Sequence, residues 1–498
     1  MLLDLDACHR ALRSRDARFD GWFVTAVTAT GIYCRPSCPA PAPRREHVRC
    51  FASAAAAQQA GYRACPRCRP DAAPGSPEWL GRADVAARAM RLILDGVVDR
   101  EGVDGLAHRL GYSQRQLHRV LVAELGTGAL ALARAQRAQT ARILLTGTEL
   151  PVTEVAFGAG FSSLRQLGDT VRAIYARTPT ELRRLARRAA TGEPAVAQTI
   201  AVRLAHRAPL ATGPLFDFLG RRAIAGVEAY DGTTYRRSLR LPHGEGTVAL
   251  RAGDGAGDGV RACFALSDLR DLTAAIARCR LLLGLDADPQ AVDAQLGEDP
   301  LLAPLVAGTP GLRVPGAVDG FELAVRAVAG QQVSLAGART VLARLVRAAG
   351  APLASPELPL THAFPPAAAI ERLASAGHAA FAMPGARRRT LAALAGAVAA
   401  GELTIDAAAD PQRLAAGLRA IGGIGPWTAG YVAMRAAADP DVFLARDLGV
   451  RRGLAALGEP TDARAAERLA ERWRPWRSYA TMHLWRADAA RPAIARSA

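Results

Sequence analysis

The stretch LRAIGGIGPWTAGYVAMRAAADPDVFLARDLGV, residues 418–450, decides how the C-terminal part of the chain folds. It predicts a helix that ends in a glycine-rich turn and a second helix that begins at Pro426, because glycine permits a positive φ and proline suits a first helical turn. Backbone amides at a helix N-terminus attract phosphate. A glycine-rich turn can also join two helices without any ligand. We expect this one to contact a DNA phosphate through Gly422, Gly423 and Gly425.

An aspartate near the end of this stretch favours a DNA-binding turn over a turn without a ligand. Asp447 lies 20 residues beyond Trp427, after the apolar run 442–444. The whole stretch resembles the helix-hairpin-helix DNA glycosylases, specifically the 3-methyladenine DNA glycosylase II (AlkA) family, in which the hairpin grips the phosphate backbone and the matching aspartate is catalytic. The segment ERLAERWRPWRSYATMHLW, residues 467–485, is similar to the C-terminal helices of that family. The resemblance implies an all-α glycosylase domain over 311–498.

An aromatic pocket suits the substrates of such an enzyme. A base inside a duplex must flip out to be reached, and an alkylated purine such as 3-methyladenine is cationic, so aromatic rings attract it. As the base leaves, the sugar becomes a cation that the Asp447 carboxylate can stabilise. We expect the pocket to be lined by Trp427, Tyr431, Trp485 and Phe218, although core packing is an equally good interpretation of Phe218.

The chain contains no lysine, and this bears on the reaction type. Bifunctional relatives carry a lysine where this chain has Trp427, and that lysine forms a Schiff base with the sugar. We therefore predict a monofunctional enzyme that leaves an abasic site.

Composition indicates a large nucleic-acid-binding protein. The 498 residues suffice for several domains, and 63 basic residues against 46 acidic ones give a net charge of +17. All the basic residues other than histidine are arginine, which codon bias also favours. No apolar run of membrane length and no signal peptide is apparent, so the sequence predicts a cytoplasmic, nucleoid-associated bacterial protein without membrane contact.

Six of the eight cysteines fall in residues 1–75. Cys34 and Cys38 are separated by three residues, Cys65 and Cys68 by two, and 26 residues lie between the pairs. Two close pairs joined by a longer loop are typical of one tetrahedral zinc ion with four thiolate ligands. The sequence predicts a small zinc domain over 1–75.

The words around these cysteines, FVTAVTATGIYCRPSC and GYRACPRCRPD, resemble the N-terminal domain of the adaptive-response regulator Ada. That resemblance implies that Cys34 is both a zinc ligand and the acceptor of a methyl group from a DNA phosphotriester. Zinc keeps a thiol deprotonated, and the thiolate is the nucleophile. Among the nearby arginines, Arg35 and Arg45 are candidate DNA contacts, although a lone arginine is more often a solvated surface charge.

Two similar passages follow the linker DAAPGSP at 71–77. VDGLAHRLGYSQRQLHRVLVAELG at 103–126 and VTEVAFGAGFSSLRQLGDTVRAIYARTPTELR at 152–183 each predict a helix, a glycine turn, a serine N-cap and a basic helix. The caps are expected at Ser113 and Ser162. Two copies in tandem resemble the AraC-type DNA-binding domain, predicted over 80–188. Its candidate groove residues include Gln114, Arg115, Arg119 and Arg165.

After a second linker at 189–198, short β-like runs separated by Gly and Asp cover about 200–310. This segment resembles the α/β N-terminal domain of AlkA, and its opening LFDFLGRRAIAGVE contains Phe218. Cys263 and Cys279 are expected to be buried thiols without partners.

The passage FELAVRAVAGQQVSLAGARTVLARLV, residues 321–346, resembles the AlkA helix pair whose turn reaches the minor groove. The prototype places an apolar wedge residue there, whereas this chain has Gln332 after Gln331. We expect both glutamines to contact DNA, and the Gln332 amide can still occupy the gap left by an extruded base.

Together these features predict a multidomain α+β protein: a zinc domain, an all-α tandem helix-turn-helix domain, an α/β domain and an all-α helix-hairpin-helix domain. The expected function is an alkylation-damage response, combining a methyl-sensing transcriptional activator with a DNA glycosylase. The expected partners are alkylated and operator double-stranded DNA and RNA polymerase. Two alternatives are a transcription regulator with a non-catalytic DNA-clamping half, and a glycosylase whose first half is only a zinc-bearing anchor.

Overall fold

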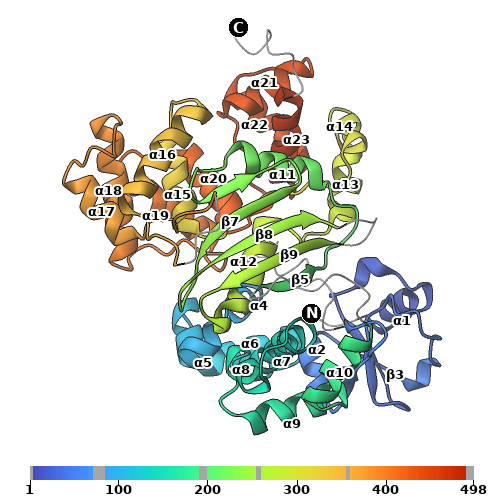
Figure 1. Ribbon diagram of the computed structural model, residues 1–498. Coiled ribbons are helices and arrows are strands. Elements are labelled where there is room, and N and C mark those ends of the chain that lie inside the picture. Colours follow the sequence, from blue (N-terminus) through green and yellow to red (C-terminus); the bar gives the residue numbers. More distant parts are fainter. Residues whose placement is uncertain (1–3, 71–84, 190–198, 254–258, 355–358, 490–498) are drawn as a thin grey trace. The chain divides into compact units, whose positions relative to one another are not determined.

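The computed structural model describes residues 4–70, 85–189, 199–253, 259–354 and 359–489 (Figure 1). The linkers predicted at 71–77 and 189–198 lie outside the described residues, apart from residue 189. The chain is multidomain and helix-rich, as predicted, and it forms two compact units. Unit 1 contains Met1–Arg207 and Leu239–Arg278, and unit 2 contains Ala208–Ser238 and Cys279–Ala498.

The N-terminal part of unit 1 is a small sheet with the strand order β3-β1-β2-β4. Its strands are β1 (Val24–Val27), β2 (Ile32–Cys34), β3 (Val48–Phe51) and β4 (Arg63–Ala64), and α1 (Leu5–Ser14) and α2 (Ala54–Gln59) complete the domain. β2 and β4 are parallel, and Tyr33 pairs with Ala64. Because Cys34 and Cys65 come directly after these paired residues, the sheet brings the two cysteine pairs together.

Among the described residues of unit 1, seven helices follow the small sheet. They are α4 (Val85–Leu94), α5 (Val97–Leu110), α6 (Gln114–Leu125), α7 (Ala129–Gly147), α8 (Val152–Gly158), α9 (Leu164–Tyr175) and α10 (Pro179–Ala189). The pairs α5–α6 and α8–α9 are the two predicted helix-turn-helix passages, and each turn contains a glycine with positive φ, Gly111 or Gly160.

The second helix of each passage, α6 or α9, begins at a serine N-cap, but the expected cap of α9 was wrong. Ser113 caps α6 in a capping box with Gln116, as predicted. In α9 the N-cap is Ser163, not Ser162. The Ser163 hydroxyl accepts from the Gln166 backbone N–H at 3.2 Å, while Ser162 donates to the Gln166 side chain. Adjacent serines made the two choices indistinguishable in the sequence.

The remainder of unit 1 contains three antiparallel strands, with β9 (Val260–Leu266) between β5 (Ile200–Leu204) and β8 (Glu245–Ala252). Burial alternates along β9, so Phe264 is buried and its neighbour Cys263 is exposed. The expectation of a buried Cys263 was therefore wrong, whereas Cys279 is buried as predicted.

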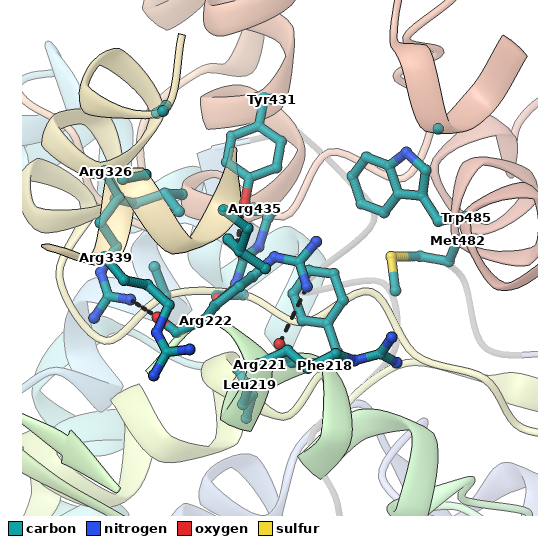
Figure 2. Close-up of a pocket in the computed structure, with 18 of the residues that line it drawn as sticks. Phe218, Leu219, Arg221, Arg222, Arg326, Arg339, Tyr431, Arg435, Met482 and Trp485 are labelled. Carbon is teal, nitrogen blue, oxygen red and sulfur yellow. Dashed lines mark hydrogen bonds between the residues drawn. The ribbon is translucent and has the colours of Figure 1, made fainter. Parts of the chain in front are cut away.

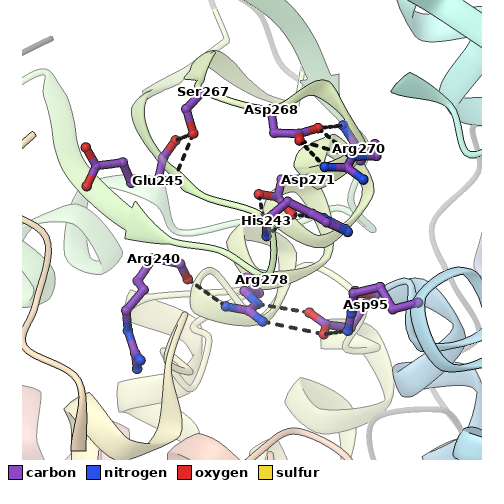
Figure 3. A network of polar contacts seen from close by, with 10 residues as sticks. Asp95, Arg240, His243, Glu245, Ser267, Asp268, Arg270, Asp271 and Arg278 are labelled. Atoms are coloured by element: carbon purple, nitrogen blue, oxygen red, sulfur yellow. Dashed lines mark hydrogen bonds and ion pairs between the residues drawn. The ribbon is translucent and has the colours of Figure 1, made fainter. Parts of the chain in front are cut away.

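Ion pairs connect this segment of unit 1 to its helices (Figure 3). The Arg278 guanidinium contacts Asp95 at 2.9 Å and donates to the Arg240 carbonyl oxygen at 2.9 Å. The His243 ring contacts the buried Asp271 carboxylate at 2.9 Å. Residues 239–278 and the helices that begin at Val85 therefore belong to the same compact unit.

Unit 2 is built mainly from helices around one apolar core, in which α15 is almost wholly buried. Its elements include α11 (Thr212–Arg221), β6 (Glu228–Tyr230), β7 (Thr234–Arg240, whose last two residues fall in unit 1), α13 (Pro289–Gly297), α14 (Ala303–Gly308), α15 (Gly320–Ala329), α16 (Leu335–Ala349), α17 (Ala367–Ser375), α18 (Gly385–Ala399), α19 (Pro411–Arg419), α20 (Pro426–Ala436), α21 (Leu448–Ala456), α22 (Ala463–Ala470) and α23 (Arg477–Ala489). The helices α19 and α20 are those predicted around the glycine-rich turn.

A buried ion network ties α15 to the β6–β7 hairpin within unit 2. Arg237 contacts Glu322 at 2.8 Å, and Arg326 contacts Glu228 at 2.6 Å. Arg326 also donates to the backbone carbonyl of Arg222 at 3.2 Å, which fixes the chain just after α11. Charges this deeply buried are tolerated because each has an opposite partner.

Candidate active site, metal centre and DNA-facing elements

Four thiols gather in the N-terminal domain. The sulfur atoms of Cys34, Cys38, Cys65 and Cys68 all lie within 4.8 Å of one another. A zinc ion with bonds of about 2.3 Å to four sulfurs would place them about 3.8 Å apart, so the cluster needs only a small contraction to hold zinc. Three of the thiols are buried, and Cys34 is more accessible than the other three. The sequence prediction of a four-cysteine zinc site is confirmed.

A buried acid supports the loop that carries the first cysteine pair. The Asp20 carboxylate accepts hydrogen bonds from the backbone N–H of Ser37 at 3.0 Å and from its hydroxyl at 2.6 Å. Arg35 contacts the same carboxylate at 3.3 Å and remains 34% exposed. Arg45 pairs with Asp6 and is 70% exposed. Both arginines thus have internal partners but retain accessible surface.

The residues predicted to enter a DNA groove are exposed on α6 and α9, the second helix of each helix-turn-helix passage. Gln114, Arg115 and Arg119 lie on α6, and Arg165 on α9 is 93% exposed. Leu117 and Leu167 on the same helices are fully buried, so these helices present one face to the core and the polar face outward.

In unit 2, the first residue of the predicted glycosylase site is Asp447, which is also the N-cap of α21. One carboxylate oxygen accepts from the indole N–H of Trp485 at 2.7 Å, and the other accepts from the indole N–H of Trp427 at 2.9 Å. The first oxygen also accepts from the Val450 backbone at 3.0 Å. Three donors therefore fix the orientation of the carboxylate.

This carboxylate and four aromatic rings line a cavity of about 530 Å³. Figure 2 shows Phe218, Tyr431 and Trp485 at this cavity. Trp427 and Tyr431 stack with ring centroids 5.4 Å apart, because they lie one turn apart on α20. Phe218 and Trp485 are nearly parallel, at 6.1 Å and 18°. The structure thus brings together the four aromatic residues that the sequence suggested for a base pocket.

The same cavity contains arginines that the sequence interpretation missed. Arg222 lies over the Phe218 ring at 3.6 Å, and Arg435 lies 5.0 Å from the same ring. Burial opposes the change, but Arg435 and Arg222 lower the pKa of Tyr431 below its ordinary value. A signal was present, since each arginine follows a predicted pocket residue by four positions: Arg222 after Phe218, and Arg435 after Tyr431.

The glycine-rich turn depends on one glycine more than on the others. Gly423 has φ +91°, and a Cβ there would lie 2.0 Å from the Thr390 hydroxyl oxygen. A Cβ on Gly422 or Gly425 would meet nothing within 4 Å, and neither residue has a positive φ. The turn itself therefore requires glycine at Gly423, whereas Gly422 and Gly425 stay predicted DNA contacts.

The turn between α15 and α16 is fastened to this glycine-rich turn. The Gln331 amide nitrogen donates to the Gly423 carbonyl oxygen at 3.1 Å and to the Thr428 hydroxyl at 3.0 Å. Gln332 is exposed and has φ +55°, which is unusual for a residue other than glycine. Gln331 therefore joins the two turns, while Gln332 is presented outward beside Gly330 and Val333, which line the pocket.

Comparisons with known proteins cover almost the whole chain. Family models match the metal binding domain of Ada at residues 7–71, a helix-turn-helix domain at 106–185 and the AlkA N-terminal domain at 201–319. The chain is 54% identical over 484 residues to the "Probable bifunctional transcriptional activator/DNA repair enzyme AlkA" of Mycobacterium tuberculosis, covering 97% of this chain and 96% of that protein. This chain belongs to that family.

Two parts of the chain also match separate proteins. The chain is 34% identical over 285 residues to DNA-3-methyladenine glycosylase 2 of Escherichia coli, covering 56% of this chain and 94% of that protein. It is 36% identical over 152 residues to the bifunctional transcriptional activator/DNA repair enzyme Ada of Escherichia coli, covering 30% of this chain and 41% of that protein.

A solved structure shows the same fold in the glycosylase-like part. The 3-methyladenine DNA-glycosylase from Archaeoglobus fulgidus aligns with a TM-score of 0.50 and 22% identity, over 58% of this chain and 98% of that one. Within the part of the chain that the structure describes, no helix has the length and apolarity needed to cross a membrane.

Proposed function

We propose that unit 2 is a monofunctional DNA glycosylase that hydrolyses the N-glycosidic bond of alkylated purines such as 3-methyladenine. The observation that carries this proposal is the Asp447 carboxylate, held by two indole N–H groups inside an aromatic cavity. A flipped base enters the cavity, and its ring stacks on the aromatic walls. The carboxylate then faces the sugar as positive charge develops there.

The hydrolysis follows from this placement. The bond between C1′ and the base nitrogen breaks, and its electron pair leaves with the base. The negative charge of Asp447 stabilises the cationic sugar, and a water molecule adds to C1′. The turn at Gly422, Gly423 and Gly425 and the turn at Gln331 and Gln332 would contact the duplex on either side of the extruded nucleotide.

We propose in addition that residues 1–75 form a methyl sensor and residues 80–188 an operator-binding domain, followed by glycosylase domains at 200–310 and 311–498. The Cys34 thiolate attacks the methyl carbon of a DNA methylphosphotriester: an S–C bond forms, the C–O bond breaks, and the phosphodiester leaves with the electron pair. Zinc held by the four cysteines would keep the thiols deprotonated. The match of residues 7–71 to the metal binding domain of Ada supports the assignment of Cys34 as the acceptor.

Methylation of the Cys34 thiolate removes one negative charge from the zinc cluster. Repulsion from the DNA phosphates then falls, so the affinity of the protein for operator DNA should rise. Arg35 and Arg45 in the zinc domain and the exposed residues of α6 and α9 would provide the DNA contacts, and RNA polymerase would be the partner of the activated form in the cytoplasm. A gel-shift titration of residues 1–188 at fixed salt, before and after treatment with methylated DNA, tests the switch. An unchanged affinity would argue against it.

One experiment separates the proposed function from its two alternatives. Purified protein is incubated with methylated DNA, and free bases and methylated cysteine are measured in the same sample. Release of 3-methyladenine excludes a non-catalytic clamp, and methylcysteine at Cys34 excludes a zinc domain that serves only as an anchor. Borohydride should trap no protein–DNA adduct, because no lysine is present to form a Schiff base.

A further inference from the structure

The base pocket contains a positive charge without a carboxylate partner. The Arg222 guanidinium lines the cavity and lies 3.6 Å from the Phe218 ring centroid (Figure 2). Its Nη1 donates to the Phe218 carbonyl oxygen at 3.2 Å. Among the residues described in the structure, Arg222 forms no ion pair. Burial lowers the pKa of Arg222 to about 10, so the group still carries its charge at neutral pH.

The other buried arginines of this pocket have carboxylate or backbone carbonyl partners. Arg435 donates to the Pro315 carbonyl at 2.6 Å, to the Gly316 carbonyl at 2.9 Å and to the Tyr431 hydroxyl. Arg237 and Arg326 pair with glutamates. Arg222 differs from them because its polar neighbours are the Phe218 carbonyl and the Tyr431 side chain and not a carboxylate, so its charge at the cavity wall is available to a ligand.

Hydrolysis of an N-glycosidic bond always moves negative charge toward the base. A cationic base such as 7-methylguanine leaves as a neutral molecule, and a neutral base such as hypoxanthine leaves as an anion. In both cases the base becomes one charge unit more negative in reaching the products. A fixed cation beside the base therefore stabilises the transition state relative to the bound substrate.

We propose that Arg222 is a catalytic residue that receives the departing base and stabilises the electron pair arriving on it. The proposal rests on the glycosylase function proposed above. The C1′–N bond breaks, its electrons move onto the base beside Arg222, water adds to C1′ opposite Asp447, and the released proton passes to solvent. Asp447 and Arg222 thus stabilise the two opposite charges that the breaking bond creates.

This arrangement affects the two kinds of base differently. A cationic base is repelled by Arg222 in the bound state, and the repulsion disappears as the base becomes neutral, so Arg222 raises both kcat and KM. A neutral base binds without this repulsion and is stabilised only as it becomes an anion, so Arg222 raises kcat and kcat/KM while KM stays constant.

The test compares Arg222→Met with wild type on two duplexes that differ only in carrying 7-methylguanine or hypoxanthine at one position. With hypoxanthine, we expect kcat/KM to fall on the order of 100-fold, the usual loss for one electrostatic contact. With 7-methylguanine, kcat and KM should fall together, leaving kcat/KM within about threefold of wild type. Arg222→Lys, which keeps the charge, should restore most of the hypoxanthine rate.

The control is Arg347→Met on the exposed surface of α16, which lowers the net charge equally and should leave both rates unchanged. A misfolded fraction of Arg222→Met would lower both rates by the same factor, so the ratio between substrates remains informative. Equal loss of kcat/KM on both duplexes, or no hypoxanthine release by wild type, overturns the proposal. If wild type releases neither base and also no 3-methyladenine, the proposed glycosylase function itself fails.

Discussion

Two tryptophans of the pocket have a second task that their position in the sequence did not reveal. Trp427 and Trp485 were expected to stack on a base, and their indole N–H groups also hold the two oxygens of Asp447. The spacing of 20 residues between Trp427 and Asp447 follows from this contact, because the chain must return from α20 to the start of α21. The proposed substrate stacking and the orientation of the carboxylate would therefore depend on the same side chains.

Replacing Trp427 with Phe should separate these two tasks. Phenylalanine keeps an aromatic face but loses the N–H donor, and a hydrogen bond to a charged group contributes about 1.5–3 kcal/mol. We expect base release to slow by roughly 10-fold or more when measured with saturating enzyme. In the Asp447→Asn background the same change should have little further effect, because the charged acceptor is gone.

The matched control is Trp476→Phe. The Trp476 indole N–H donates to the neutral Gln295 side chain at 3.0 Å, away from the carboxylate, so base release should remain at the wild-type rate. Fully additive effects of Trp427→Phe and Asp447→Asn would show that the indole does not act through the carboxylate.

At the scale of single elements, the turn between α19 and α20 offers a sharp comparison between neighbouring glycines. Gly423→Ala places a methyl group 2.0 Å from the Thr390 hydroxyl oxygen at a positive φ, so the turn must distort. We expect a loss of about 1–3 kcal/mol in the free energy of unfolding and weaker duplex binding. Gly422→Ala meets nothing within 4 Å and should have the wild-type free energy of unfolding in denaturant titration. Equal behaviour of the two variants would show that the turn tolerates a side chain.

Sequence patterns predicted elements more successfully than they predicted contacts. The glycines and Pro426 located both hairpin helices, and the cysteine spacing identified the zinc ligands, because these signals depend on neighbours along the chain. The choice between Ser162 and Ser163 as a cap depended on one residue of register, and the exposure of Cys263 depended on which face of β9 is buried. The Gln331 contact to Gly423 joins segments 92 residues apart, which no local pattern encodes.

At the scale of the whole molecule, zinc should stabilise only the N-terminal domain. That domain has strands of two to four residues and small apolar clusters of its own, such as Cys8, Ala11 and Phe23, so much of its stability must come from the metal. A strong chelator should make residues 1–70 sensitive to protease and abolish methyl transfer, while base release continues. Cys65→Ala should mimic the chelator, and Cys263→Ser, which alters an exposed thiol outside the cluster, should retain zinc. Loss of base release on chelation would contradict this view.

The two proposed chemistries should also be separable by single substitutions. Asp447 lies in unit 2 and Cys34 in unit 1, and each is positioned by contacts within its own unit. Asp447→Asn keeps the size and hydrogen-bonding capacity of the side chain but removes the charge beneath the sugar cation. Base release should fall on the order of 100-fold or more, while duplex binding and methyl transfer persist.

Cys34→Ser should have the opposite effect, because it removes the thiolate nucleophile and leaves the carboxylate and its two indoles intact. Release of 3-methyladenine and methyl label on protein, measured for wild type and both variants, give the comparison. Wild-type base release by Asp447→Asn would remove the catalytic assignment of that residue. If both activities fell together in either variant, the two units would have to act as one, since neither substitution removes a contact that the other site uses.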